Sequence, residues 1–408
     1  MNPGRKARPR IAAVVTEYRR YSHAEHILDR YLWGYSWEGR HHRPPIDLVS
    51  LYTDQVPDSD LSRHRSQLFP RMKIYKTVAE ALCRGGDRLD VDGVLLIGEH
   101  GDYPFNEKGQ HLYPRYELFQ RIVKVFRDSG RSVPVFNDKH LSWNWDWAVE
   151  MVETARELKF PLLAGSSLPV ARRIPAIELP RRTQVIEAMC VAVGGIDGYD
   201  IHALEAMQSM VERRRGGETG VEWIHAVKGA AVWEALAAGS FDAGGWDPEL
   251  FRACLCRSHR LVPARQGFNH HLPSNRQVHE LIEHEDNPNT PVLYRYQHRD
   301  GLKMSMLLIE GVVHDFTFAA RLAGRSKPLS TQMYLPPREV CNFFNPLVHA
   351  TEQLFTERRA PYPIERTLLT TGLTAAGVES LFKGQVRLNT PHLAVRYRPT
   401  KHSTFWSS

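Results

Sequence analysis

Short apolar runs alternate with segments of helical periodicity through the first 165 residues. The apolar runs are rich in Val, Leu and Ile, and their length is typical of buried strands. The predicted strands span residues 11–16, 46–52, 90–97, 133–136 and 160–165. The predicted helices span residues 23–35, 78–83, 116–127 and 143–158. Strands that are apolar throughout and alternate with helices indicate a parallel sheet covered on both faces, so residues 1–165 are predicted to form a Rossmann-type domain.

The pattern changes after residue 166, where longer strands follow one another with fewer helices between them. The predicted strands span 184–194, 223–230, 292–297, 303–309 and 312–320, and the predicted helices span 202–214 and 375–382. The last two strands are expected to form a hairpin around Glu310-Gly311. This mixture predicts an α+β domain at 166–345, with a largely antiparallel open sheet and helices on one face. Residues 346–408 are expected to add a helix and a tail that pack back on the body. The predicted fold class is therefore α/β, with a Rossmann-type parallel sheet followed by an α+β domain.

Composition is that of a soluble globular protein with two domains. Of the 408 residues, 42% are hydrophobic and 24% are charged. The net charge of +7 is spread along the chain, which favours a small anionic or polar substrate and no nucleic-acid partner. Because no run of 18 apolar residues and no secretory signal occurs, we expect no membrane partner and a cytoplasmic location. The five cysteines, including Cys254-Leu-Cys256, match no zinc-knuckle spacing and are expected to be reduced thiols.

Polar side chains follow the predicted parallel strands at the point where each strand ends. They are Glu17, Asp54, Glu99, His100, Asp138, Lys139 and His140. Because the carboxyl ends of parallel strands meet at one edge of a sheet, these groups should gather there and shift each other's pKa values. The alternative is that they are solvated turns capping the next helices, as Ser142 would cap the helix that follows Lys139. His100 and His140 fit that alternative poorly, because a cation at a helix N-terminus is disfavoured.

More polar residues surround this edge than a packed turn requires. Besides Glu99, His100 and the Asp138-Lys139-His140 turn, the candidates for substrate binding are Asp102, Tyr103, Asn106, Lys108 and Asn137. Their hydrogen-bonding groups suit a small substrate rich in hydroxyl or carboxylate groups.

A second polar cluster occurs where the second domain's first helix begins. His202 and Glu205 lie three residues apart on one helical face, just after Asp200. This spacing can bind a metal, although a buried histidine with satisfied hydrogen bonds is the alternative. The candidate metal ligands are Glu99, His100, Asp138, His140, His202 and Glu205. The adjacent pairs His41-His42 and His270-His271 are expected to be loop residues rather than ligands.

These residues and the order of elements resemble the glucose–fructose oxidoreductase, inositol dehydrogenase and MocA (Gfo/Idh/MocA) family. Asp138-Lys139-His140 falls where that family has a Glu-Lys-Pro turn with a catalytic lysine, and His202 with Glu205 matches its second-domain histidine. Asp54 stands where an acid often holds the cofactor ribose. The resemblance implies that Lys139 and His202 face each other across a cleft and move the proton of a substrate hydroxyl. It also implies NAD(P) as a cofactor and a homo-oligomer that pairs through the open sheet.

The sequence departs from that family after the first strand. The family has a G-x-G-x-x-G turn, whereas this chain has Thr16-Glu-Tyr-Arg-Arg-Tyr21 without a glycine. Glycines there allow the backbone to approach the pyrophosphate, and Glu17 adds a negative charge instead. Arg19 and Arg20 would have to supply the phosphate contacts with their side chains.

Three functional hypotheses follow. The first, favoured by the missing glycines, is an enzyme that uses Lys139, His202, His140 and Asp138 for acid–base chemistry, with or without a divalent metal, as a lyase, isomerase or hydrolase. The second is an NAD(P)-dependent oxidoreductase of a sugar or polyol, with Asp54, Arg19 and Arg20 at the cofactor. The third is a non-catalytic ligand-binding protein on the same fold.

Overall fold

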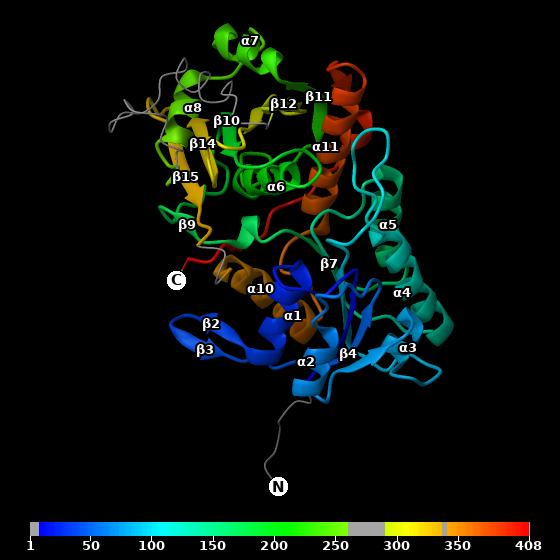
Figure 1. The fold of residues 1–408 in the computed structure, drawn as a ribbon. Coiled ribbons are helices and arrows are strands. Elements are labelled where there is room, and N and C mark those ends of the chain that lie inside the picture. The colour runs from blue at the N-terminus through cyan, green and yellow to red at the C-terminus, as the bar shows by residue number, and fades with distance from the viewer. Residues whose placement is uncertain (1–7, 260–289, 337–340, 408) are drawn as a thin grey trace.

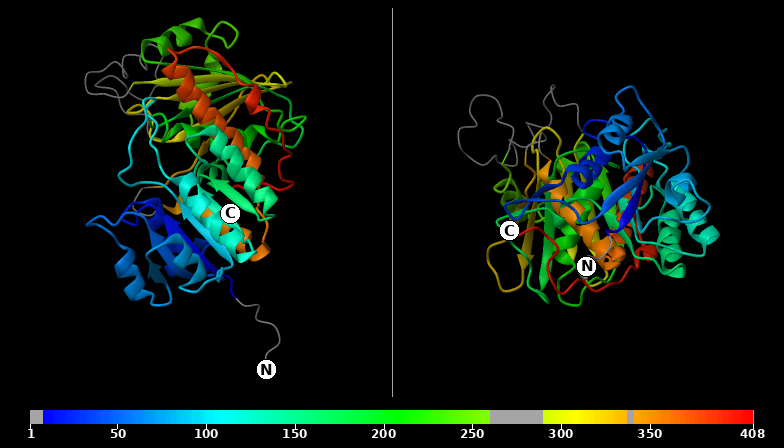
Figure 2. Two further views of the ribbon diagram at one scale, coloured as in Figure 1. Left: turned by 90° about the vertical axis from the view of Figure 1, so that its right-hand side faces the viewer. Right: turned by 90° about the horizontal axis from the view of Figure 1, so that it is seen from below.

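The computed structural model describes residues 8–259, 290–336 and 341–407. Two β-sheets, each covered by helices, lie one above the other, with the N-terminal sheet below in Figure 1. The last two long helices are α10 (Asn345–Glu357), which lies between these two layers, and α11 (Ile364–Phe382), which lies beside them (Figures 1 and 2). No helix in the described ranges is both long enough and apolar enough to cross a bilayer.

The first sheet is entirely parallel and has the strand order of a Rossmann fold. Its strands, in spatial order, are β5 (Lys73–Tyr75), β4 (Asp47–Thr53), β1 (Arg10–Val15), β6 (Gly93–Ile97), β7 (Val135–Asp138) and β8 (Leu162–Gly165). The chain moves outward from β1 in one direction through β4 and in the other through β6, and all these pairs are parallel. In such sheets ligands bind beyond the carboxyl ends of the two strands where this order reverses, here β1 and β6. The predicted Rossmann-type sheet is therefore confirmed.

Alternate side chains of the central strand β1 supply both hydrophobic cores of this layer. Ala12 and Val14 face α3 (Val78–Cys83), α4 (Arg115–Ser129) and α5 (Trp145–Glu157). Ile11, Ala13 and Val15 face α1 (His23–Trp33) and α10, whose Leu347, Val348, Leu354 and Phe355 belong to the same core. The C-terminal part of the chain thus supplies one of the helices that cover the N-terminal sheet. The short helix α2 (Ser62–Leu68) precedes β5 at the edge of this sheet.

The second sheet is mixed and mostly antiparallel. Its order is β16 (Leu388–Asn389), β11 (Val221–Lys228), β12 (Val292–His298), β13 (Lys303–Leu308), β10 (Val185–Ala192), β14 (Phe316–Leu322), β15 (Leu329–Met333) and β9 (Arg173–Ile174). The expected hairpin is wrong, because β10 lies between β13 and β14 and pairs in parallel with β13. A run of apolar strands fixes burial but not which neighbour each strand pairs with.

Helices cover both faces of the second sheet rather than the one face that was expected. On one face, α6 (Asp200–Val211) and α11 pack through Leu204, Met207, Leu369 and Leu373. On the other, α7 (Ala230–Ala238) and α8 (Pro248–Leu255) form a separate core that includes Phe251. Cys254 is buried in that core, whereas Cys256 is exposed, so their side chains point apart.

Helix α11 is longer than the predicted helix at 375–382 and joins the two layers. It contacts α6 and β11 in the second layer and α5 and β8 in the first. A Cβ atom at Gly372 would lie 2.3 Å from Leu393 and 2.6 Å from Trp145, so only glycine allows this close packing. Gly372 weakens the helical pattern in the sequence, but it permits α11 to pack closely against Trp145 and Leu393.

Three local boundaries also differ from the sequence prediction. Strand β7 continues through Asp138, so Asn137 and Asp138 are buried strand residues rather than turn residues. Helix α5 is capped by Asn144, whose Oδ1 accepts from the Trp147 amide at 3.2 Å, and not by Ser142. His41 and His42 lie in β3 (Arg40–His42), which pairs with β2 (Tyr35–Trp37), and not in a loop. The pair at 270–271 lies outside the described residues.

A buried ion pair connects α11 to the end of α6. Arg366 Nε and Nη2 donate to Glu212 Oε2 and Oε1 at 2.9 and 2.6 Å, and both side chains are 2% exposed. Replacing Arg366 by Met should lower the free energy of unfolding by about 3–5 kcal/mol, because Glu212 would remain buried without its cation. Urea denaturation measures this loss.

The matched control is Arg359→Met, because Arg359 is 80% exposed and pairs with Glu357 at 3.5 Å. Such a surface pair should change the free energy of unfolding by no more than about 0.5 kcal/mol. Equal losses in the two variants would show that the buried pair does not stabilise the packing of α11 against the end of α6.

Candidate active site

The Glu99 carboxylate lies at the centre of a buried charged cluster beyond the ends of β6 and β7. Glu99 follows β6, and its Oε1 lies 2.6 Å from Lys139 Nζ, which follows β7. Its Oε2 forms an ion pair with Arg115, the first residue of α4, whose side chain is fully buried. Burial opposes the ionisation of Glu99, but Lys139 and Arg115 outweigh that effect and hold its pKa well below the usual range. One carboxylate therefore compensates two buried cations.

The backbone on either side of this ion pair adopts a conformation that is unusual for residues other than glycine. His100 and Lys139 have φ values of 72° and 62°. The Asn137 side chain fixes the second turn, because its Nδ2 donates to the carbonyl oxygens of Asp138 at 3.3 Å and His140 at 3.1 Å. Such left-handed residues cost about 1 kcal/mol each and tend to occur at functional sites. The turn places the Lys139 ammonium group over Glu99.

A second pair lies beside the first. His23, at the start of α1, has its Nδ1 2.6 Å from Oδ2 of Asp138, which is fully buried. The His23 ring packs edge-on against His100, with ring centroids 5.2 Å apart. Burial and the nearby His23 lower the pKa of His100 to about 3, so His100 is neutral at physiological pH. These contacts bring together four of the residues that were expected to meet at one edge of the sheet, namely Glu99, His100, Asp138 and Lys139.

His140 lies beneath this cluster rather than at its surface. It is 2% exposed, and Arg115 Nη1 donates to its Nε2 at 3.3 Å. Burial and the charge of Arg115 lower the pKa of His140 well below its usual value. In this position His140 contacts Arg115 and has almost no exposed surface, and its expected catalytic role stays a prediction.

His202, at the start of α6, approaches the cluster from the second domain. Lys139 Nζ donates to the carbonyl oxygen of Gly198 at 3.1 Å, four residues before His202. Burial, then the charges of Lys139 and His23, lower the pKa of His202 and so favour its neutral imidazole. Its Nδ1 has no hydrogen-bond partner among the described residues. Lys139 and His202 therefore lie within electrostatic reach of each other, across the junction of the two domains.

Glu205 points away from His202. Its Oε2 accepts from the Ser166 amide at 2.6 Å and its Oε1 accepts from Thr367 Oγ1 at 3.0 Å. It connects the end of β8 to α11, and so it does not join a cluster around His202.

The six residues that were expected to bind a metal either contact other groups or lie too far apart to share an ion. Within the described residues, no three of them bring their ligand atoms within 4.8 Å of one another. Among the residues that the structure describes, these six therefore do not form a metal-binding cluster at this edge of the sheet.

The loop after β6 makes hydrogen bonds within itself and an ion pair with α11. Asn106 accepts from the amides of Lys108 and Gln110, both at 3.0 Å, and so closes the loop on itself. Lys108 pairs with Glu379 of α11, and Asp102 is exposed. Asn106 and Lys108 thus stabilise the loop and do not line the Lys139 cluster, although they were expected to contact a substrate.

The turn after β1 does not fit the pyrophosphate of a dinucleotide bound as in a glycine-rich turn. The Tyr18 side chain is fully buried in this turn, and its hydroxyl donates to Asp29. Ser22 Oγ accepts from the Glu25 amide at 3.2 Å, while Glu25 Oε2 accepts from the Tyr21 amide at 2.5 Å. Ser22 therefore caps one of the helix amides that would otherwise meet a phosphate, and the Glu25 carboxylate places an acid beside them.

The residues that were expected to bind a cofactor also contact other side chains of the protein. Arg19 Nε lies 2.5 Å from Glu17 Oε1, and the Arg20 guanidinium stacks on the exposed Tyr21 ring at 4.9 Å. Asp54 accepts from the hydroxyls of Tyr52 at 2.6 Å and Tyr103 at 2.8 Å. The carboxylate of Asp54, which was expected to hold a ribose, is therefore hydrogen-bonded to two tyrosine hydroxyls.

Comparison with known proteins rests on structure alone, since neither family models nor curated sequences give a match. Myo-inositol dehydrogenase from Lactobacillus casei, described in complex with NAD(H) and myo-inositol, superposes with a TM-score of 0.56 at 11% identity, over 94% of this chain and 96% of that one. GenD2 from gentamicin A biosynthesis, described in complex with NAD, gives 0.55 at 11% identity, over 94% and 97%. A probable dehydrogenase from Thermotoga maritima gives 0.55 at 11% identity, over 94% and 99%.

The chain has the Gfo/Idh/MocA-type dehydrogenase fold. The likeness extends over both domains, which confirms the expected combination of a Rossmann-like sheet and a mostly antiparallel sheet.

Two residues of the cluster escaped the sequence analysis. Arg115 lies 16 positions after Glu99, behind a long loop, and nothing in its local pattern distinguishes it from a surface arginine. His23 offered a weak signal, because it directly follows the capping residue Ser22 and a histidine is disfavoured at a helix N-terminus.

The proximity of Lys139 to His202 can be measured in solution. Replacing Lys139 by Met should raise the pKa of His202, because a nearby positive charge is removed while the ring remains buried. NMR titration of the imidazole resonances, assigned with His202→Gln, reports this change. Lys124→Met is the matched control, since Lys124 is 72% exposed on α4 and pairs with Asp128. An unchanged His202 titration in Lys139→Met would show that the two groups do not face each other.

Proposed function

We propose that the chain is an oxidoreductase that acts on a hydroxyl group of a sugar or polyol, with NAD(P) as the electron carrier. The observation that carries the proposal is the Glu99–Lys139 ion pair beside a neutral His202, set in a dehydrogenase fold. The structural neighbours add support, since the titles of two name NAD or NAD(H) and one names myo-inositol.

The chain's own residues account for the movement of a proton. A substrate hydroxyl placed between Lys139 and His202 would accept a hydrogen bond from the ammonium group and donate its proton to the imidazole. Glu99 holds Lys139 in place through its Oε1. The positive charge of Lys139 would stabilise the negative charge that develops on the substrate oxygen as the proton leaves.

The substrate would enter beside the partly exposed histidines. His23 retains 15% side-chain exposure, and Tyr199, which precedes α6, is 40% exposed. Their polar and aromatic groups suit a ligand with several hydroxyls. When bound, a nicotinamide dinucleotide would supply the hydride acceptor, although the residues after β1 do not fit its pyrophosphate in the way that a glycine-rich turn does.

A second candidate function is acid–base chemistry without electron transfer, of the lyase or isomerase type. The specific observation in its favour is the filled turn after β1, together with the Tyr103–Asp54 hydrogen bond. The same Lys139 and His202 would then remove and return a proton next to a carbonyl group.

Lys139→Met should lower kcat by about 10²- to 10⁴-fold under either candidate function, because it removes both a hydrogen-bond donor and a charge from the reacting oxygen. For the oxidoreductase, nicotinamide absorbance during turnover of myo-inositol and related polyols measures the effect. For the redox-neutral candidate, NMR detection of polyol conversion without added nucleotide measures it. Lys124→Met, on the exposed face of α4, should retain wild-type turnover.

Binding of the four nicotinamide nucleotides separates the two candidates. Binding of NAD(H) or NADP(H) below about 1 mM, the upper end of ordinary KM values, supports the oxidoreductase. No binding of any of them would contradict it and leave the redox-neutral chemistry.

A further inference from the structure

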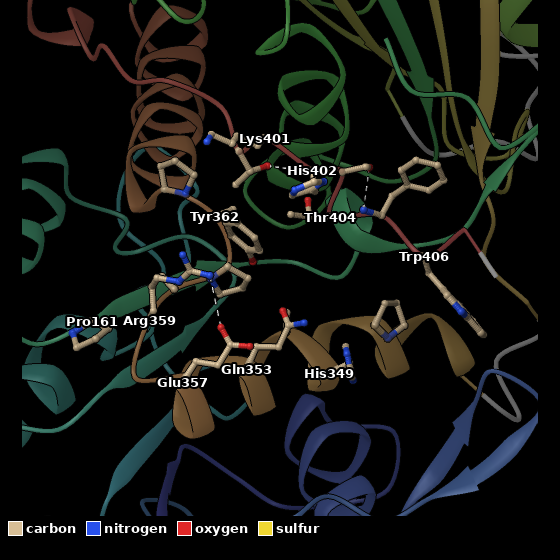
Figure 3. A pocket seen from close by; sticks show the side chains of 18 of the residues that line it. Pro161, His349, Gln353, Glu357, Arg359, Tyr362, Lys401, His402, Thr404 and Trp406 are labelled. Atoms are coloured by element: carbon tan, nitrogen blue, oxygen red, sulfur yellow. Dashed lines mark hydrogen bonds and ion pairs between the residues drawn. The ribbon is translucent and has the colours of Figure 1, made fainter. Parts of the chain in front are cut away.

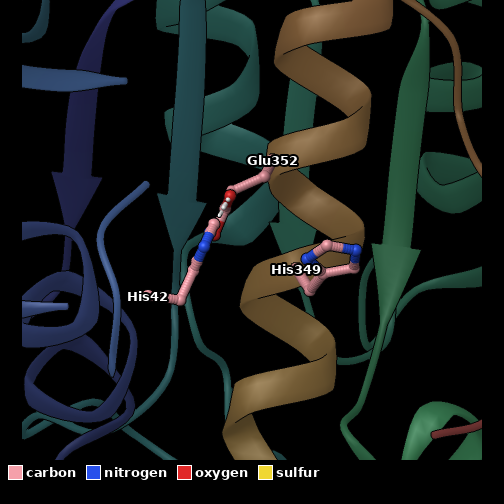
Figure 4. A group of neighbouring side chains, drawn as sticks. All are labelled: His42, His349 and Glu352. Carbon is pink, nitrogen blue, oxygen red and sulfur yellow. Dashed lines mark hydrogen bonds and ion pairs between the residues drawn. The ribbon is translucent and has the colours of Figure 1, made fainter. Parts of the chain in front are cut away.

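A second cluster of ionisable side chains lies away from Lys139, where the β2–β3 hairpin meets α10. His42 comes from β3, and His349 and Glu352 come from α10, three residues apart (Figure 4). The ligand atoms of all three lie within 4.8 Å of one another, and among the described residues this is the one such group.

The contacts within the cluster resemble those of a preformed ligand set. Glu352 is 4% exposed, and its Oε2 lies 2.8 Å from His42 Nε2. The other oxygen of Glu352 accepts from the Tyr35 hydroxyl, which orients the carboxylate as outer-shell groups orient metal ligands. His349 stacks on Trp37 with centroids 4.2 Å apart, and its buried Nδ1 has no hydrogen-bond partner in the described part of the chain.

This donor set suits zinc. Two imidazole nitrogens and one carboxylate are ligands that Zn²⁺ takes in tetrahedral sites, with a fourth position left to water. Bonds of about 2.1 Å separate neighbouring ligands of a tetrahedral ion by about 3.4 Å. The His42–Glu352 contact of 2.8 Å would therefore open slightly when the ion binds.

The position of the cluster leaves access for an ion. His349 also lines a cavity of about 1190 Å³ between α10 and the C-terminal tail, as Figure 3 shows together with Trp406. His42 retains 30% side-chain exposure. An ion could therefore reach the cluster without unfolding of the surrounding elements.

We propose that His42, His349 and Glu352 form a zinc-binding site that fastens the β2–β3 hairpin to α10. The ion would replace the direct His42–Glu352 contact and provide the missing partner for His349. The site does not depend on the proposed reaction at Lys139.

The test is a titration of the full-length protein with Zn²⁺ after removal of metal by EDTA, followed by calorimetry and by thermal unfolding. Wild type should bind one equivalent with a Kd at or below the micromolar range, and its Tm should rise, because the ion binds only the folded site. His349→Phe, which keeps an aromatic ring against Trp37, should weaken binding on the order of 100-fold or more. His42→Ala should have a comparable effect.

His41→Ala is the matched control, because His41 is the exposed neighbour of His42 on the same strand and should leave zinc affinity unchanged. Circular dichroism verifies that each variant is folded. Absence of stoichiometric binding in the wild type, or equal binding in wild type, His349→Phe and His42→Ala, would overturn the proposal and leave the cluster as a structural ion pair.

Discussion

One buried carboxylate, Glu99, compensates the charges of Arg115 and Lys139, and the arrangement of the candidate site depends on it. Removing charged groups from water costs several kcal/mol per ion, so this cluster persists only where opposite charges and hydrogen bonds are already in place. The strand ends provide that condition. Strand β6 delivers Glu99, β7 delivers Lys139, and α4 begins with Arg115 at the same edge.

The same constraint connects the two domains. Lys139 donates to the carbonyl of Gly198, which holds the segment before α6 against the first sheet and brings His202 close to the charged cluster. Helix α11 reinforces this junction because it contacts α5 and β8 in the first layer, while the buried Arg366–Glu212 pair fixes it to the end of α6 in the second. A dehydrogenase fold is thereby retained, although the turn after β1 is filled by Tyr18 and is unsuited to a glycine-turn dinucleotide site.

The sequence was sufficient to predict what depends on local pattern. Apolar strands ending in acids, imidazoles and an amine predicted both the parallel sheet and the edge where Glu99 and Lys139 meet. The sequence could not predict contacts between residues far apart in the chain. Examples are the position of β10 between β13 and β14, the hydrogen bond of Glu205 to Ser166, and the ion pair of Lys108 with α11. In each case the local pattern is compatible with several partners, and tertiary packing selects one.

The most direct test of this account is the coupling free energy between Glu99 and Lys139. It is obtained from urea unfolding of the wild type, Glu99→Gln, Lys139→Met and the double variant at neutral pH. A buried ion pair predicts that the two single losses exceed the double loss by about 2 kcal/mol or more. Additive losses, with a coupling below about 0.5 kcal/mol, would contradict the central role of the Glu99 carboxylate.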